Sequence, residues 1–319
     1  MTLVRNLLVG GAISALTATS AFAEGAKVTI GDLTWTGATA IGHVIKAVIE
    51  GPMEGEAEIV EGLSDGGAIA AGMDKGDGTA DVYTDLWMPN RQGIWDKYVD
   101  GAQSVAVNIP YQGTQMVYVP SYMAEKGVRT ILDLAKPEVA AMFDKDGNGK
   151  GEYWAGAEGW KSTKMWQVKF KSYGLDALWE PEILEDATFK GQLKAAIQKE
   201  EPILFYYWTP EWVHAAYDLT PIQELERVEG CEDMDLDAED WLEVSHFNCA
   251  ASDATIYVAY SKSLEERNPP VAKMLSQMAL DPAVVNQWIL QIGRDKEDPQ
   301  DVAEAWVAEN ADIVNGWIN

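Results

Sequence analysis

The sequence predicts an α/β fold with substantially parallel sheets, because strand patterns alternate with helix patterns along the whole chain. The connections between strands and helices carry several tryptophans, and ligands bind at such connections in α/β sheets. A chain of 319 residues suits two compact lobes or one large domain, with enough interior to fold without a structural metal.

The expected elements follow from hydrophobic spacing and from the glycines and prolines that interrupt it. Apolar residues from Ile41 to Ile49 recur at helical spacing, and Pro120 ends a strand pattern. The expected strands cover 27–30, 57–60, 81–85, 115–119, 202–207 and 254–259. The expected helices cover 39–49, 66–73, 127–135, 137–143, 163–173, 189–199, 271–278, 282–292 and 302–317.

Residues 1–23 have the pattern of a secretory signal peptide. Arg5 supplies the positive start, 7–16 is a short apolar stretch, and Ala21-Phe22-Ala23 is the small-residue cleavage pattern. The apolar stretch is too short to span a bilayer. We therefore expect a soluble protein that is exported to a bacterial periplasm and cleaved after Ala23.

The chain is strongly acidic, with 51 acidic and 24 basic residues and a formal charge of −27. Such a charge argues against a nucleic-acid partner, whose binding surface would be basic. The two cysteines, Cys231 and Cys249, both lie in the exported part. In an oxidising compartment we expect them to form one disulfide across an acidic loop, worth roughly 3 kcal/mol.

Thirteen tryptophans are present, and several have turn-forming neighbours. Trp87 comes just before Met88-Pro89, Trp160 follows Gly159, and Trp208 comes just before Thr209-Pro210. We therefore expect these indoles to project from strand ends or loops, where binding sites are built. Indole faces attract bulky, weakly hydrated cations. Core packing is the commoner role of any single tryptophan, but three on separate loops predict a cage for a methylated cation.

Four segments carry a resemblance to a known family: 80–89, 139–160, the string Phe205-Tyr206-Tyr207-Trp208-Thr209-Pro210-Glu211-Trp212, and 306–317. Together they resemble the periplasmic glycine betaine-binding proteins of ABC-type osmolyte importers, close to the choline-binding branch. The resemblance implies a type II-like periplasmic binding protein, with two α/β lobes that close over a ligand around a hinge of two crossing segments. It also implies a membrane permease and its ATPase as partners.

With these boundaries, we expect lobe 1 to comprise 24–116 and 256–319, and lobe 2 to comprise 117–255. We also expect a monomer without a cofactor. In the family, aromatic residues that hold the cation match Trp87, Trp208 and, where it is present, Trp160. Trp35 matches a first-loop aromatic of some branches, and Tyr111 is a further candidate wall.

A zwitterionic ligand also needs donors for its carboxylate. Lys161 and Ser162 stand at a predicted helix start, where backbone N–H groups bind anions. They replace a small, uncharged pair in better-known members, so only backbone donation carries over. Arg91 replaces a histidine of the glycine betaine branch, and its guanidinium can bind a carboxylate bidentately; the alternative is a solvated surface cation. An acidic side chain is not needed for the cation, and it would repel the ligand's own carboxylate.

A Gly-rich acidic segment resembles a calcium loop, with oxygen-bearing side chains at Asp144, Asp146, Asn148 and Glu152. The glutamate expected at the twelfth place is absent, because that position is Ala155. A turn without a metal is therefore the favoured interpretation, and a bound calcium would have a structural role.

The sequence thus predicts a binding protein rather than an enzyme. Its first expected ligands are glycine betaine and the sulfonium analogue dimethylsulfoniopropionate; a choline-like alcohol ranks third, because Arg91 would then lack an anion. One alternative is a secreted carbohydrate-binding protein or glycoside hydrolase that uses tryptophan platforms, although no catalytic carboxylate pair is evident. Another is a ligand-loaded partner of a sensory receptor.

Overall fold

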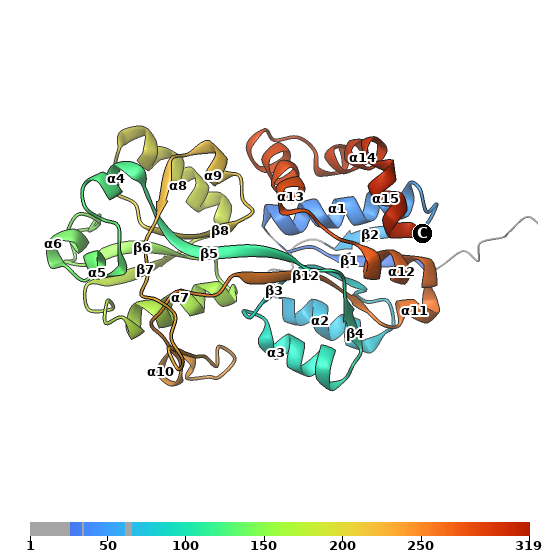
Figure 1. The fold of residues 1–319 in the computed structure, drawn as a ribbon, viewed down its shortest axis with the longest axis horizontal. Helices are drawn as coiled ribbons and strands as arrows, with labels where there is room; N and C mark the ends of the chain where they lie inside the picture. The colour runs from blue at the N-terminus through green and yellow to red at the C-terminus, as the bar shows by residue number, and fades with distance from the viewer. Residues whose placement is uncertain (1–25, 34, 61–65) are drawn as a thin grey trace, which may run out of the picture.

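The structure, a computed structural model, describes residues 26–33, 35–60 and 66–319. The predicted signal peptide, residues 1–23, lies outside these residues. Figure 1 shows two lobes side by side, joined by two long strands that run between them. Every helix among the described residues is too short or too polar to span a bilayer.

Lobe 1 is built on a parallel core in which β1 pairs with both β2 and β3. Its strands are β1 (Val28–Gly31), β2 (Ala57–Val60), β3 (Val82–Met88) and β4 (Val105–Val107). Its helices are α1 (Thr36–Glu50), α2 (Gly66–Lys75), α3 (Gln92–Ile94), η1 (Trp95–Gly101), α11 (Leu264–Arg267), α12 (Pro269–Gln277), α13 (Pro282–Ile289), η2 (Leu290–Arg294), α14 (Pro299–Glu309) and α15 (Ala311–Ile318). In Figure 1, α1 and α14 lie on one side of the strands and α2 on the other. The apolar stripe of α1 is buried along the helix, as its spacing predicts.

Lobe 2 has a second parallel core, in which β6 pairs with both β7 and β8. Its strands are β6 (Gly151–Gly156), β7 (Trp179–Ile183), β8 (Phe205–Thr209), β9 (Leu219–Pro221) and the short pair β10 (Glu232–Asp233) and β11 (His246–Phe247). Its helices are α4 (Ser121–Glu125), α5 (Ile131–Leu134), α6 (Pro137–Ala140), α7 (Lys161–Ser172), α8 (Asp186–Lys199), α9 (Val213–Ala216) and α10 (Trp241–Val244). Aromatic rings fill its interior; Trp154 stacks on Phe189 at 3.9 Å between ring centroids.

Two antiparallel strands connect the lobes: β5 (Tyr111–Pro120) and β12 (Ala254–Ser261). Residues 111–113 of β5 pair with β12, and residues 114–118 pair with β8 in lobe 2. β12 continues along β3 in lobe 1. The resulting sheet order, β2-β1-β3-β12-β5-β8-β6-β7, runs through the whole molecule. The lobe boundaries placed at 116/117 and 255/256 fall inside these two strands and stay a prediction.

Three local differences from the expected elements affect the site or the closing helices. β3 and β8 both end later than expected and include Trp87 and Trp208, so these indoles project from the ends of strands. β6 was not expected at all, because its sequence is rich in glycine and yet wholly buried. The single helix expected over 302–317 is two helices that meet at Asn310, whose amide donates to the Trp306 carbonyl at 2.8 Å. Such local side-chain bonding competes with helix continuation.

Candidate functional site

A cavity of about 50 Å³ lies where β3 and the start of α1 meet β8 and the start of α7. The described residues that line it are Trp35, Asp85, Trp87, Asn90, Arg91, Gln115, Trp160, Lys161, Ser162, Tyr206 and Trp208. About 10–15 Å³ of such volume holds one water molecule. The space therefore suits a solute of a few heavy atoms and is too small for a sugar chain.

Three indoles line the cavity, and the Trp160 ring stands nearly perpendicular to each of the other two. Trp160 meets Trp35 at 5.8 Å and 80° between rings, and it meets Trp208 at 5.2 Å and 79°. All three are buried, with no more than 8% of each residue exposed. Trp87 is half-buried and adds a fourth aromatic surface. Rings set at different angles can turn more than one face toward the same small volume, and ring faces attract a bulky cation.

Local structure explains why these indoles meet. Trp35 and Trp160 are the N-cap residues of α1 and α7, with the extended backbone that precedes a helix. Trp87 and Trp208 lie near the ends of β3 and β8. Two helix starts and two strand ends therefore converge from both lobes. This is the position where ligands bind in open α/β sheets.

Asp85 also lines the cavity, and only 2% of it is exposed. The Trp35 indole donates to its Oδ2 at 2.5 Å, and the Tyr111 hydroxyl donates to its Oδ1 at 3.0 Å. Burial raises the pKa of this carboxyl, while hydrogen bonds from Trp35, Trp87 and Tyr111 lower it. The sequence argument that a carboxylate would disfavour a zwitterion did not anticipate this residue. These hydrogen bonds offset part of the cost of burying Asp85, and its pKa stays above the ordinary value.

The amide and hydroxyl groups of Asn90, Gln115 and Tyr206 form a hydrogen-bonded network on the cavity wall. Asn90 donates to Gln115 Oε1 at 2.7 Å, and the Tyr206 hydroxyl donates to the same oxygen at 3.0 Å. Gln115 Nε2 returns a hydrogen bond to Asn90 at 3.1 Å. This network fixes the side chains and gives the wall a polar area beside the indoles.

Sequence reasoning missed four lining residues: Asp85, Asn90, Gln115 and Tyr206. The alternation of side chains along a strand, with a period of two residues, could have identified two of them. Asp85 lies two residues before Trp87 on β3, and Tyr206 lies two residues before Trp208 on β8, so each pair shares a face of its strand. Gln115 stands opposite Trp208 in the β5–β8 ladder, a pairing that no local pattern reveals.

The three residues that were expected to supply hydrogen-bond donors for a ligand carboxylate also line the cavity: Arg91, Lys161 and Ser162. Arg91 is 7% exposed and is the N-cap residue of α3. The Lys161 ammonium contacts the Asp237 carboxylate and the Leu236 carbonyl, so this charge is already paired. In the part of the chain that is described, no side chain caps the start of α7. Its first N–H groups are thus suited to an anion.

The structure brings seven of the eight candidate ligand-binding residues to one cavity. The eighth, Tyr111, is the first residue of β5 and stands behind Asp85 instead of on the wall. A disulfide joins Cys231 to Cys249 in the segment that carries Asp237.

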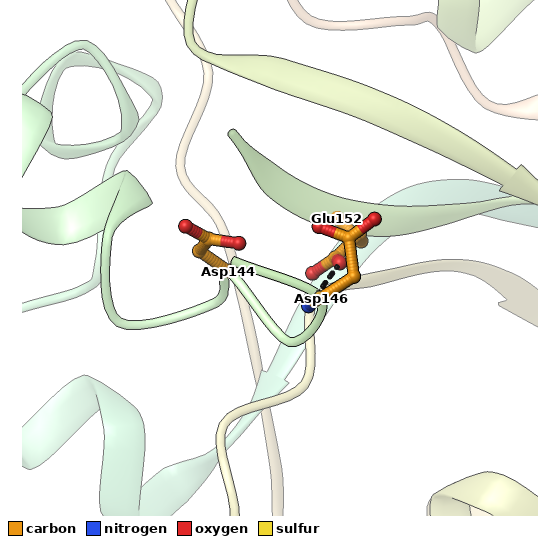
Figure 2. A group of neighbouring side chains, drawn as sticks. All are labelled: Asp144, Asp146 and Glu152. Atoms are coloured by element: carbon orange, nitrogen blue, oxygen red, sulfur yellow. Dashed lines mark hydrogen bonds between the residues drawn. The ribbon is translucent and has the colours of Figure 1, made fainter. Parts of the chain in front are cut away.

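Figure 2 shows the acidic side chains of the Gly-rich turn, Asp144, Asp146 and Glu152, none of which lines this cavity. Carboxylate oxygens of Asp144, Asp146 and Glu152 lie within 4.8 Å of one another. Backbone N–H groups already engage them: Asp144 accepts from Gly147 at 2.7 Å, and Glu152 accepts from Lys145 at 2.9 Å. Asn148 donates to Glu180 at 2.7 Å. Hydrogen bonds therefore account for the shape of the turn, and the interpretation of a turn without a metal stays a prediction.

Residues 26–309 match a family described as the substrate binding domain of ABC-type glycine betaine transport systems, OpuAC. The chain belongs to this family. A glycine betaine/proline betaine-binding periplasmic protein from Salmonella typhimurium is 23% identical over 60% of the chain and 59% of the relative. A trimethylamine N-oxide-binding protein from Pelagibacter ubique is 23% identical over 61% and 60%, respectively. The chain thus spans about three fifths of the length of these relatives.

Solved structures of OpuAC-type proteins share the fold. A choline-binding protein in complex with choline has a TM-score of 0.69 at 20% identity, over 91% of each chain. Lactococcal OpuAC, closed and in complex with glycine betaine, has a TM-score of 0.69 at 19% identity, over 92% of this chain and 99% of that one. The chain therefore has the mixed α/β fold of type II periplasmic binding proteins, as the sequence predicted.

Proposed function

We propose that this OpuAC-family protein captures a small methylated onium zwitterion in the periplasm and delivers it to an ABC permease and its ATPase. Glycine betaine and dimethylsulfoniopropionate are the proposed ligands. One observation carries the proposal: four indoles, a guanidinium and a helix N-terminus from both lobes line the same small cavity. The names of the relatives, which describe binders of betaines and of trimethylamine N-oxide, support it.

The aromatic walls supply the cation site. In the proposed complex the onium head contacts the faces of Trp35, Trp87, Trp160 and Trp208, which line the cavity. Each desolvated cation–π contact contributes on the order of 1–2 kcal/mol. Asp85 adds a negative charge that is held in place by Trp35 and Tyr111. In this way Tyr111 acts through Asp85 rather than as a wall.

The donors supply the anion site. In the proposed complex, Arg91 and the first N–H groups of α7, at Lys161 and Ser162, bind the ligand carboxylate. Hydrogen bonds to a charged group contribute about 1.5–3 kcal/mol each. Lys161 takes part through its backbone, because Asp237 and Leu236 hold its ammonium. After the entropy of association and closure is subtracted, a net of about −8 kcal/mol, or micromolar affinity, is reasonable.

A carbohydrate-active enzyme is the weaker candidate. Glycoside hydrolysis needs two carboxyl groups on opposite sides of a sugar ring. Asp85 is the carboxyl group among the described lining residues, and it is held by hydrogen bonds in a space too small for a glycan chain. We therefore propose a binding protein that is not an enzyme. We also propose that it is a monomer.

Ligand binding tests the proposal directly. Protein freed of ligand by unfolding and refolding is titrated with glycine betaine, dimethylsulfoniopropionate, choline and trimethylamine N-oxide, with tryptophan fluorescence as the signal. We expect saturable micromolar binding of a zwitterion and no turnover of oligosaccharides. Trp87→Ala should remove most of the response, and Trp241→Ala, outside the cavity, should keep it. No binding of any onium solute, or hydrolysis of a glycan, would refute the proposed function.

A further inference from the structure

A second contact between the lobes lies behind the ligand cavity, where α8 and the segment after β8 meet lobe 1. Figure 1 shows α8 and α9 on the side of lobe 2 that faces α13. Trp212, between β8 and α9, packs against η2 of lobe 1. The fit is close, because a Cβ added to Gly293 would lie 2.5 Å from Trp212 Nε1 and 3.4 Å from the Thr36 methyl group.

Two buried carboxylates and one partly buried ammonium meet at this contact. The Lys190 ammonium lies 2.8 Å from Asp186 Oδ2 and 3.4 Å from Glu211 Oε1, all on lobe 2. Asp186 is 7% exposed and Glu211 is 1% exposed. Lys190 also lies over the Trp212 ring, 5.6 Å from its centroid. Two carboxylates thus hold one ammonium against the indole that meets lobe 1.

Lys190 reaches across to lobe 1. Its Nζ lies 3.5 Å from the Thr36 hydroxyl oxygen, at the first residue of α1. Thr36 follows Trp35 directly, so this contact adjoins one wall of the ligand cavity. Lys190 therefore bridges a carboxylate pair in lobe 2 and the helix start that carries a cavity indole in lobe 1.

The same cluster supports a cavity wall in lobe 2. The Tyr207 hydroxyl donates to Asp186 Oδ1 at 2.9 Å, and the Tyr207 ring stacks on Trp208 at 4.4 Å between centroids. Trp208 lines the cavity. Asp186 and Lys190 thus connect the Trp208 wall to the Trp35 wall through two contacts that lie outside the cavity.

We propose that Lys190 is a positioning residue for lobe closure, which holds Thr36 and Trp35 of lobe 1 against the Trp208 side of lobe 2 without touching the ligand. The inference rests on the proposed function, since it assigns a role in capturing that ligand. The lobe 1 side of the contact is Thr36 and Gly293. The lobe 2 side is Asp186, Lys190 and Trp212, with Glu211 beside them.

The charges give this contact a pH dependence. Burial alone would lower the pKa of Lys190, but Glu211 and Asp186 raise it overall, so the ammonium keeps its charge. Burial raises the pKa of Glu211 to about 7, while Lys190 lowers it and Asp186 raises it. Tyr207 is the other titratable group that faces the cluster, and burial raises its pKa well above the usual value.

The direction of this pH dependence is set by the state, open or closed, in which Glu211 binds its proton more tightly. Burial raises the pKa of Glu211, so a closure that adds to this burial takes up a proton and is favoured as the pH falls. We therefore expect ligand affinity to rise from pH 8 to pH 6. Glu211→Gln should remove the rise in ligand affinity toward low pH. A rise that came from Asp85 would remain in this variant.

The test uses calorimetric titration of the full chain with glycine betaine at pH 6, 7 and 8. Lys190→Met should weaken binding about tenfold, and Lys190→Arg, which keeps the charge, should recover most of it. Lys190→Met leaves the two lobe 2 carboxylates together without a cation. A second variant therefore changes the lobe 1 side of the contact and leaves these charges in place: Gly293→Ala places a methyl group against Trp212. It should weaken binding about tenfold as well. Gly316→Ala is the matched control, because a Cβ there meets nothing within 4 Å.

The outcomes separate the two proposals. If wild type binds glycine betaine and both Lys190→Met and Gly293→Ala bind equally well at every pH, the positioning role is wrong. If wild type binds none of the onium solutes, the proposed function fails. The contact is then judged by small-angle scattering of the unliganded proteins. A larger radius of gyration for Gly293→Ala than for wild type and Gly316→Ala would support it, and equal radii would overturn it.

Discussion

The Trp35 indole N–H donates to the Asp85 carboxylate at 2.5 Å, and both residues line the same cavity. Tyr111 donates to the other oxygen of Asp85 at 3.0 Å. One carboxylate therefore fixes an aromatic wall from α1 and receives support from β5. The shape of the candidate cage and its charge thus depend on the same side chain.

This relationship predicts that Asp85→Asn changes ligand preference. The asparagine keeps an oxygen that Trp35 can reach, but it removes the negative charge beside the proposed cation. A net cation such as choline should lose about tenfold in affinity, or on the order of 1.4 kcal/mol. Glycine betaine should lose less, because Asp85 also repels its carboxylate. Fluorescence titration of both ligands measures the difference, with Asp312→Asn on exposed α15 as control. Equal losses for the two ligands would show that Asp85 acts only through shape.

Arg91 gives the complementary prediction. Its guanidinium lines the cavity and is proposed to bind the ligand carboxylate. Arg91→Ala should weaken glycine betaine and dimethylsulfoniopropionate by about 10- to 100-fold, the loss of about 1.5–3 kcal/mol of charged hydrogen bonding. Choline, which lacks a carboxylate, should bind as before. Arg294→Ala is the control, because Arg294 is an exposed arginine paired with Asp295. Undiminished binding of every zwitterion by Arg91→Ala would contradict the carboxylate assignment.

The aromatic part of the candidate site could be predicted from local sequence. Trp87, Trp160 and Trp208 have glycine or proline neighbours, and these neighbours mark the ends of strands and starts of helices where a cavity forms. Trp35 stands in a strand-to-helix connection for the same reason. Local sequence therefore identifies which indoles line the cavity.

The rest of the site depends on pairing between distant segments. Gln115 reaches the cavity because β5 pairs with β8, whose Tyr206 is 91 residues away in the sequence. Tyr206 itself differs, since it shares a strand face with Trp208 and local spacing could have found it. Lys190 and Thr36 are 154 residues apart and meet only across the two lobes. Alternation of strands and helices along the sequence indicates parallel strand pairs alone. It therefore did not predict that the two crossing strands, β5 and β12, are antiparallel.

A buried ion pair in lobe 2 gives a prediction about stability. Lys169 of α7 is fully buried; its Nζ lies 2.7 Å from Glu224 Oε1 and donates to the Cys249 carbonyl at 2.9 Å. Burial lowers the pKa of Lys169 and raises that of Glu224, so each charge depends on the other. Lys169→Met should cost about 3–5 kcal/mol of unfolding free energy, because it leaves a buried carboxylate unpaired. The double variant with Glu224→Gln should cost less. Urea unfolding of wild type, both single variants and the double variant measures this, and additive losses would show that the pair is not coupled.

The disulfide gives a prediction that separates stability from binding. Cys231 and Cys249 are 18 residues apart, and their bond closes the segment that carries Leu236 and Asp237. A loop of this size contributes roughly 3 kcal/mol, mainly by restricting the unfolded chain. Replacing both cysteines with serine should therefore lower the unfolding free energy by about that amount. Ligand affinity should change little, since Lys169 still holds the Cys249 end of the segment and Lys161 still contacts Asp237. Urea unfolding and ligand titration are measured on the same protein, with reduced wild type as a second sample. A large loss of affinity with little loss of stability would show instead that the disulfide positions the cavity through Lys161.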